Sequence, residues 1–264
     1  MSVLTPIVAS GAVGRVNPVA KLLAAVVLAV ALLLSIDWVS AGTALVLEAL
    51  LLPFAGLSAR QLLTRTAPLW IAAPTSVVAV ALYGRDGGAT LLQLGFVSVT
   101  DGSLALAGAI GLRILAVGVP GIVLFATTDP TDLADGLGQV LRLPSRFVLG
   151  GLAGLRLVGL FMDDWRQLAL ARRARGVADS GGPIGALKRF GQQAFALLVL
   201  SVRRGSKLAT AMEAKGFGSD RPRTWARPST FGARDAALVG IGVVVAAAAV
   251  TAAVLAGTWA FVLG

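Results

Sequence analysis

The chain contains five long apolar runs, the first four separated by short polar breaks and the fifth preceded by a long polar region. A transmembrane helix needs about 20 mainly apolar residues, and each run comes close to this length or exceeds it. The runs predict membrane-spanning helices at about Val19–Ile36, Ala41–Leu57, Pro68–Tyr83, Ser103–Ala126 and Asp235–Leu263. We therefore expect an all-α integral membrane protein with about five transmembrane helices.

The breaks between the first four runs contain helix caps, charges and glycines. Asn17 and Pro18 are typical of a helix start, with asparagine as the cap and proline in the first turn. Two arginines in Ser58–Ala67 indicate a cytoplasmic loop, whereas Gly84–Gly102 has a single arginine and is expected outside. The middle of that outer loop, Leu91–Val99, fits a short strand or a partly inserted helix.

The long polar region between the fourth and fifth runs is predicted to fold into about three helices. A helix starts near Pro130, with Thr131 or Asp132 as its cap. Apolar residues then recur on one face of 148–175, and a second long helix covers 185–215 after a break at 179–183. These helices carry apolar faces without uncharged runs long enough to span, so each face must lie against the membrane, the bundle or a partner.

Charge gives this architecture an orientation. The net charge is +10, and residues 127–234 hold 17 basic and 8 acidic residues, or +9 of it. Cytoplasmic segments of membrane proteins are rich in lysine and arginine, so the N-terminus and 127–234 are expected in the cytoplasm and the C-terminus outside. Three parts follow: transmembrane helices one to four in 1–126, a cytoplasmic helical domain in 127–234, and a final transmembrane helix in 235–264.

Composition narrows the chemistry available to the chain. Hydrophobic residues make up 56 % and charged residues 14 %, which is typical of a membrane protein. There is no cysteine and no histidine, which excludes disulfides, thiolate or histidine catalysis and Cys/His metal sites. No GxxxxGK[ST] phosphate loop occurs, so no nucleotide cofactor is expected on this chain. We expect no signal peptide and, without an aromatic-basic platform, no nucleic-acid partner.

Two segments forty positions apart resemble each other. Arg166–Gly176 and Ser206–Gly216 share leucine, alanine and glycine at five equivalent positions, and each ends in alanine, a basic residue and glycine. A terminal glycine takes the left-handed conformation that stops a helix, and a cation suits the negative end of the helix dipole. The candidate site residues at the two ends are Ala174, Arg175, Gly176, Ala214, Lys215 and Gly216, supported by Arg172, Arg173, Met212 and Glu213.

Charges elsewhere are weaker candidates. Glu48 and Arg113 lie within predicted spans, where ionisable residues are often functional. They fit a structural pair inside the bundle, a position near the interface or, for Glu48, contact with a partner. Asp163 and Asp164 are adjacent and point about 100° apart on a helix, so they do not form a catalytic carboxylate pair. We expect them to be solvated or paired with neighbours such as Arg166 or Gln167.

The paired segments resemble the two signature motifs of the transmembrane T component of energy-coupling factor (ECF) transporters, the EcfT/CbiQ type. The strings are ARRARG at 171–176 and AMEAKGFG at 211–218. NPVAKLL at 17–23, TTDPTDLADGL at 127–137 and LRLPSR at 141–146 resemble further parts of that family in the same order. The likeness covers about 17–218. Lys215 stands where the family commonly has arginine, which keeps the charge and loses the bidentate fork.

The resemblance implies a non-catalytic scaffold. Members of this family dock through coupling helices on two cytoplasmic ABC-type ATPases, which bind ATP and Mg²⁺, and hold a small membrane-embedded S component that binds a vitamin or metal micronutrient. Carried over to this chain, Arg175 and Lys215 anchor the ATPases, and Gly176 and Gly216 allow close approach. An ordinary permease subunit with its own substrate path is the main alternative. A membrane-embedded enzyme is disfavoured by the missing histidine, cysteine and clustered carboxylates.

Overall fold

The computed structural model describes residues 11–84, 87–94, 97–176, 182–218 and 224–259. Its contacts divide the chain into two compact units, which are considered separately below. Unit 1 comprises Met1–Gly136 and Ser229–Gly264, and unit 2 comprises Leu137–Pro228. Unit 2 is therefore inserted into unit 1, whose chain is interrupted at Gly136 and resumes at Ser229.

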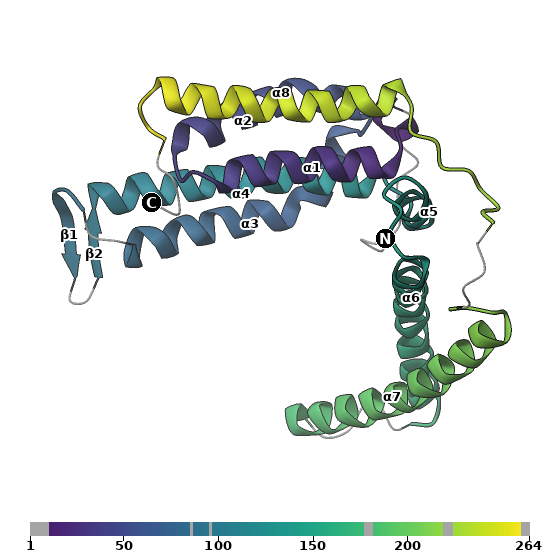
Figure 1. Ribbon diagram of the computed structural model, residues 1–264. Helices are drawn as coiled ribbons and strands as arrows, with labels where there is room; N and C mark the ends of the chain where they lie inside the picture. Colours follow the sequence, from purple (N-terminus) through teal and green to yellow (C-terminus); the bar gives the residue numbers. More distant parts are fainter. Residues whose placement is uncertain (1–10, 85–86, 95–96, 177–181, 219–223, 260–264) are drawn as a thin grey trace. The chain divides into compact units, whose positions relative to one another are not determined.

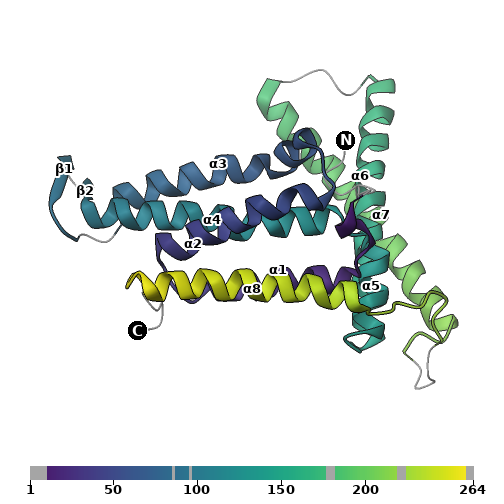
Figure 2. The ribbon, with the colours of Figure 1, turned by 90° about the horizontal axis from the view of Figure 1, so that it is seen from above.

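Unit 1 is a bundle of five long helices that run side by side (Figures 1 and 2). A short 3₁₀ helix at Ala12–Arg15 precedes the bundle, and another at Leu52–Ala55 extends the second helix. The bundle helices are α1 (Pro18–Leu33), α2 (Trp38–Leu51), α3 (Ala59–Tyr83), α4 (Asp101–Ala126) and α8 (Ala233–Leu255).

Length and composition qualify a slightly different set of helices as membrane spans from the set we predicted. Among the described residues, five helices are long and apolar enough: α2 with its 3₁₀ extension, α3, α4, α6 and α8. At 16 residues α1 is shorter than a typical span, whereas the 30-residue α6 (Ser145–Ala174) qualifies despite its place in unit 2. The protein is thus an all-α integral membrane protein, and the cytoplasmic placement of α6 stays a prediction.

The third helix starts earlier than predicted. Ser58–Ala67 is not a loop, because α3 begins at Ala59 and continues through Pro68 and Pro74. Ser58 accepts a hydrogen bond from the backbone N–H of Gln61, and the Gln61 side chain accepts one from the Ser58 N–H. This capping box supplies a strong helix start nine residues before Pro68. Two prolines in the helix interior hid the continuity, since proline removes a backbone donor and normally favours a helix end.

The segment between α3 and α4, which we predicted to lie outside, contains a β-hairpin. Strands β1 (Thr90–Leu94) and β2 (Val97–Thr100) pair antiparallel, which decides between the two possibilities left open for 91–99 in favour of strands. Thr100 then caps α4 by accepting a hydrogen bond from the N–H of Ser103. The hairpin lies at one end of the bundle, and the start of α5 lies at the opposite end (Figures 1 and 2).

Small residues allow the bundle helices to approach closely. A Cβ on Gly111 would lie 2.4 Å from the Val77 side chain, and one on Gly118 would lie 2.6 Å from the Leu69 side chain. The backbone of α4 therefore packs directly against side chains of α3. Gly242 of α8 similarly lies against Ala24 of α1. This confirms that the glycine- and alanine-rich final span serves helix packing, as is common where membrane helices pack through small residues.

Unit 2 contains the two longest helices of the chain. It holds the end of α5 (Pro130–Gln139), all of α6, and α7 (Gly182–Ala214). Asp129 caps the start of α5, because its side chain accepts a hydrogen bond from the N–H of Thr131 at 2.7 Å. The predicted cap at Thr131 or Asp132 is therefore two or three residues too late. Residues 179–181 of the predicted break lie outside the described residues, and Gly182 and Pro183 belong to α7, which therefore starts earlier than the predicted 185. Helices α6 and α7 cross each other (Figure 2).

Candidate functional site

The two repeated segments form the carboxyl ends of α6 and α7. Ala174 is the last residue of α6 and Ala214 the last residue of α7. Each is followed by a basic residue and then by a glycine with positive φ, at +72° for Gly176 and +76° for Gly216. L-residues with a Cβ rarely adopt this conformation. Glycine is therefore required at both positions for the helices to end where they do.

Hydrogen bonds complete both helix ends. The N–H of Gly176 donates to the carbonyl of Arg173 at 2.9 Å, and the N–H of Gly216 donates to that of Glu213 at 2.9 Å. At the second end, the Phe217 N–H also donates to the carbonyl of Met212 at 2.9 Å, which makes a complete Schellman motif. The glycine caps expected from the sequence are confirmed, and the two ends share the positive φ of the glycine and the hydrogen bond from its N–H.

The basic residue at each end is exposed. Arg175 and Lys215 occupy the position between the last helical residue and the capping glycine, and within the described residues their side chains make no hydrogen bond or ion pair. The last carbonyls of a helix carry partial negative charge, which stabilises each cation. Each cation therefore stays available for an ion pair with another molecule. The two ends point away from each other (Figure 2). Each therefore presents a separate cationic tip.

The supporting residues differ in their surroundings. Arg173 and Glu213 are exposed, and their carbonyls accept the glycine N–H groups. Met212 is half-buried, and its carbonyl serves the Schellman motif. Arg172 instead donates from Nη1 to the carbonyl of Arg189 at 3.3 Å, which ties the end of α6 to α7. Arg172 thus has a role within unit 2.

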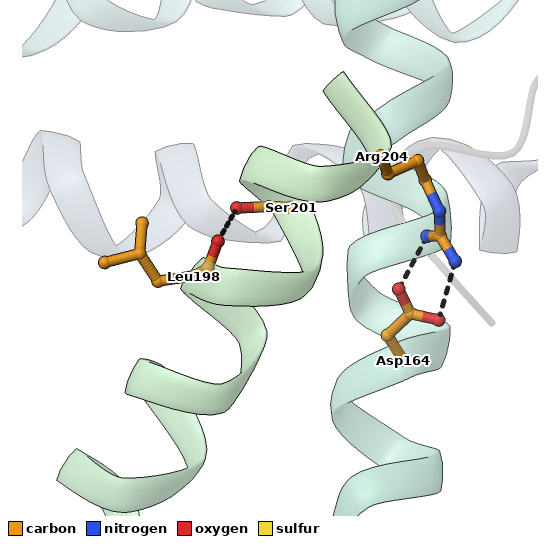
Figure 3. Close-up of polar contacts among 4 residues, drawn as sticks. All are labelled: Asp164, Leu198, Ser201 and Arg204. Carbon is orange, nitrogen blue, oxygen red and sulfur yellow. Dashed lines mark hydrogen bonds and ion pairs between the residues drawn. The ribbon is translucent and has the colours of Figure 1, made fainter. Parts of the chain in front are cut away.

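An ion pair joins α6 and α7 near their crossing. Asp164 accepts two hydrogen bonds from Arg204, at 2.6 Å from Nη1 and 3.3 Å from Nη2 (Figure 3). The expectation of local pairing holds for Asp163, which lies 3.7 Å from Arg166, and is wrong for Asp164. Asp164 lies on the α6 face that meets α7, a turn of about 100° away from Asp163. We did not predict this pair from the sequence, although the 40-residue offset of the repeat also relates Asp164 to Arg204.

Further contacts hold the same crossing. The Gln193 side chain is buried and donates to the carbonyl of Trp165 at 2.7 Å. The rings of Trp165 and Phe190 lie 5.3 Å apart at 60°, a tilted arrangement that aromatic pairs prefer. A groove of about 410 Å³ lies beside the crossing, lined by Leu149, Leu152, Ala153, Arg156, Leu157, Leu160, Arg204 and Leu208.

The two charges inside the bundle do not pair with each other. Glu48 and Arg113 are only 7 % and 9 % exposed. Both carboxylate oxygens of Glu48 and the Nε and Nη2 of Arg113 lack a hydrogen-bond partner among the described residues. Glu48 lines an otherwise apolar cavity of about 120 Å³ between α1, α2, α4 and α8. The possible pair between Glu48 and Arg113 is therefore not formed.

A polar joint at the start of α1 was only partly visible in the sequence. Asn17 caps α1 as predicted, accepting the N–H of Val19 at 2.9 Å. Its Nδ2 also donates to Ser229 Oγ at 2.9 Å and to the Thr230 carbonyl at 3.0 Å. The buried Lys21 donates to the carbonyl of Thr127 at 2.8 Å. Asn17 and Lys21 thus bind the segments through which the chain leaves and re-enters unit 1.

Comparison with known proteins decides the family. A family model described as "CbiQ: Cobalt transport protein" matches residues 10–225, which includes Asn17 and Lys21, the crossing and both cationic tips. The chain belongs to the CbiQ family. Among the described residues, no group of three or more His, Cys, Asp or Glu side chains is arranged to hold a metal ion. The word cobalt in the family description is consequently not matched by a metal site in the described part of this chain.

Three curated relatives of this CbiQ-family chain carry the same name, energy-coupling factor transporter transmembrane protein EcfT. The protein of Bacillus selenitireducens is 29 % identical over 175 residues, which are 63 % of this chain and 65 % of the relative. That of Limosilactobacillus fermentum is 29 % identical over 185 residues, covering 67 % and 68 %. That of Bacillus subtilis is 28 % identical over 187 residues, covering 68 % and 70 %. The chain thus spans about two thirds of these relatives.

Proposed function

We propose that this chain is the scaffold and energy-transducing subunit of an ECF-type importer. It couples ATP hydrolysis by two cytoplasmic ATPases to an S component that binds the transported vitamin or metal micronutrient. ATP and Mg²⁺ belong to the ATPases, and this chain performs no catalysis. The family assignment and the name shared by its relatives support this role.

The two exposed cationic tips carry the proposal. Arg175 and Lys215 stand at equivalent places on two glycine-capped helix ends, and neither has a partner among the described residues. A charge of this kind binds tightly when a partner supplies acidic groups in a partly dry groove. Two equivalent tips suit two copies of such a groove, one on each ATPase. A cation also stabilises a helix end by itself. The support therefore comes from the repetition of the whole alanine, basic residue and glycine ending on two helices.

The apolar surface of α7 supports a membrane or membrane-protein partner. Ile184, Leu187 and Phe195 are 83 %, 73 % and 68 % exposed, and Leu198 and Val202 are also exposed. Their spacing places most of them on one side of the helix. Such a stripe on a soluble surface marks an interaction site. We assign it to contact with the S component and the lipid boundary, with unit 2 and the N-terminus in the cytoplasm and the C-terminus outside.

The proposal is tested by removing both tip charges. Arg175→Ala with Lys215→Ala is expected to lower recovery of the ATPases with the tagged protein by about tenfold or more, since truncating one partner of a buried charge pair costs about 2–5 kcal/mol. ATP-dependent uptake of the substrate should fall with it. The glycine caps are untouched, so both helices still end at the same residues.

A matched control removes the same charge from the same two helices. Arg166→Ala with Lys207→Ala changes exposed basic residues eight or nine positions before each tip. This variant should keep ATPase recovery and uptake near the unchanged protein. Equal loss in both double variants would show that overall charge, and not the tips, controls association. Substrate binding to the purified chain alone would instead support a permease with its own substrate path.

A further inference from the structure

The ion pair between α6 and α7 joins equivalent positions of the repeat. Asp164 and Arg204 are 40 residues apart, the same offset that relates Arg175 to Lys215. Each member lies 11 residues before the basic residue of its own helix. At 1.5 Å of rise per helical residue, the pair is about 16 Å along the axis from either tip. The two arms between ion pair and tip are therefore equal in length.

Equivalent residues meet in this way when two similar segments are related by a two-fold rotation. In a two-fold contact, the residues that face their own counterparts lie on the rotation axis. Asp164 and Arg204 are not identical, but they occupy the same place in the two segments and contact each other (Figure 3). A two-fold rotation through this ion pair would exchange the two segments and place one cationic tip on each side of it.

The pair has the geometry to fix this crossing. It makes two hydrogen bonds, and the side chains of Asp164 and Arg204 are 16 % and 38 % exposed. A bidentate arginine–carboxylate contact restricts both distance and orientation. Asp163 and Arg166 offer the contrast, since they lie on one helix, 3.7 Å apart, and their side chains are 64 % and 68 % exposed. Exposed ion pairs of that kind contribute little to the stability of the folded protein.

We propose that Asp164 and Arg204 are positioning residues that set the distance and angle between the two ATPase-docking tips. This deepens the proposed function and rests on it. If two ATPases move relative to each other, a fixed crossing makes both helices move as one lever. A loose crossing allows each tip to follow its own ATPase. ATP hydrolysis would then continue while less of the motion reaches the rest of the complex.

The distance between the tips can be measured directly. The sequence contains no cysteine, so two introduced cysteines are the only labelling sites. Leu170 and Thr210 are exposed, equivalent positions near the two helix ends, outside the cationic tips. Spin labels on Leu170→Cys and Thr210→Cys report the distance distribution by pulsed electron resonance in the full-length protein, reconstituted in lipid nanodiscs.

Charge reversal separates a positioning role from simple stability. Asp164→Arg or Arg204→Asp alone places like charges at the crossing and should broaden or shift the distance distribution. The combined exchange, Asp164→Arg with Arg204→Asp, recreates an opposite pair and should restore a narrow distribution. Asp163→Asn is the control and should leave it unchanged. An unchanged distribution in both single reversals, or no restoration in the combined exchange, overturns the proposal.

The complete complex supplies the functional readout. With both ATPases and the S component bound, each single reversal should lower substrate uptake per ATP hydrolysed by about threefold or more, because like charges replace the bidentate contact that restricts the crossing. ATPase recovery should stay normal because the tips are intact, and the combined exchange should restore the ratio. Loss of ATPases from the unchanged protein would refute the proposed function, whereas normal recovery with an unaltered uptake ratio would refute the positioning role alone.

Discussion

Replacing Asn17 by alanine should destabilise the protein more than the loss of a helix cap alone. The substitution removes three hydrogen bonds of one side chain: the cap to Val19, and the two bonds from Nδ2 to Ser229 and Thr230. It leaves the bond from the Asn17 backbone N–H to Asp235 in place. The lost bonds connect the start of α1 to the segment that enters α8, more than 200 residues later in the chain.

The magnitude follows from these contacts. A typical intramolecular hydrogen bond adds about 0.5–1.5 kcal/mol to stability, and Asn17 is half-buried, so the lower half of that range applies. Three bonds then give about 2 kcal/mol. For a chain of this size, 1 kcal/mol changes the unfolding midpoint by about 2–4 °C. Asn17→Ala should therefore lower the midpoint by about 4–8 °C.

Thermal unfolding in mild detergent, followed by fluorescence of the five tryptophans, measures the change. Ser58→Ala is the control, because Ser58 caps α3 and makes no long-range side-chain bond in the capping box. Its loss should cost about 1 kcal/mol. Asn17→Ser keeps a cap acceptor, so its unfolding midpoint should fall by more than that of Ser58→Ala and by less than that of Asn17→Ala. A decrease for Asn17→Ala no larger than that for Ser58→Ala would refute the long-range role.

Three further substitutions test separate features. Gly176→Ala forces a Cβ at φ +72° and should weaken ATPase recovery severalfold, whereas Gly159→Ala on the same helix, with open space around it, should not. Glu48→Leu removes a buried carboxylate without a partner and should raise the unfolding midpoint; a decrease would reveal a stabilising contact. Lys21→Met keeps the aliphatic stem but removes the donor to Thr127, so the midpoint should fall by a few degrees, and an unchanged midpoint would contradict the role of that bond.

Local sequence signals predicted the helices and their ends well. Long apolar runs indicated the bundle, Asn17 and Pro18 the start of α1, and the two glycines the ends of α6 and α7. Each of these features depends on a few neighbouring residues, such as a cap side chain or a glycine with positive φ. The start of α3 was missed because Pro68 outweighed the capping box at Ser58 and Gln61 in the prediction.

Contacts between distant segments were much less predictable. Asp164 has basic neighbours in sequence, yet it pairs with Arg204 because the crossing of α6 and α7 brings that side chain closer. Glu48 and Arg113 were plausible partners by charge alone, but their positions on the packed helices keep them from pairing with each other. A single sequence shows which residues are charged. It does not show how each helix is rotated about its axis or how deeply each side chain is buried, and these decide which charges meet.

Docking of the two cationic tips on two ATPases is tested most directly by a gentle detergent pull-down of the tagged protein from its native membranes, with every co-purifying protein identified and its stoichiometry determined. We expect two ATPase chains and one small, very apolar membrane protein per copy, with the ATPases lost in the Arg175→Ala, Lys215→Ala variant. Recovery of an otherwise intact complex without any ATPase would mean that Arg175 and Lys215 only end their helices, and it would contradict the proposed docking role.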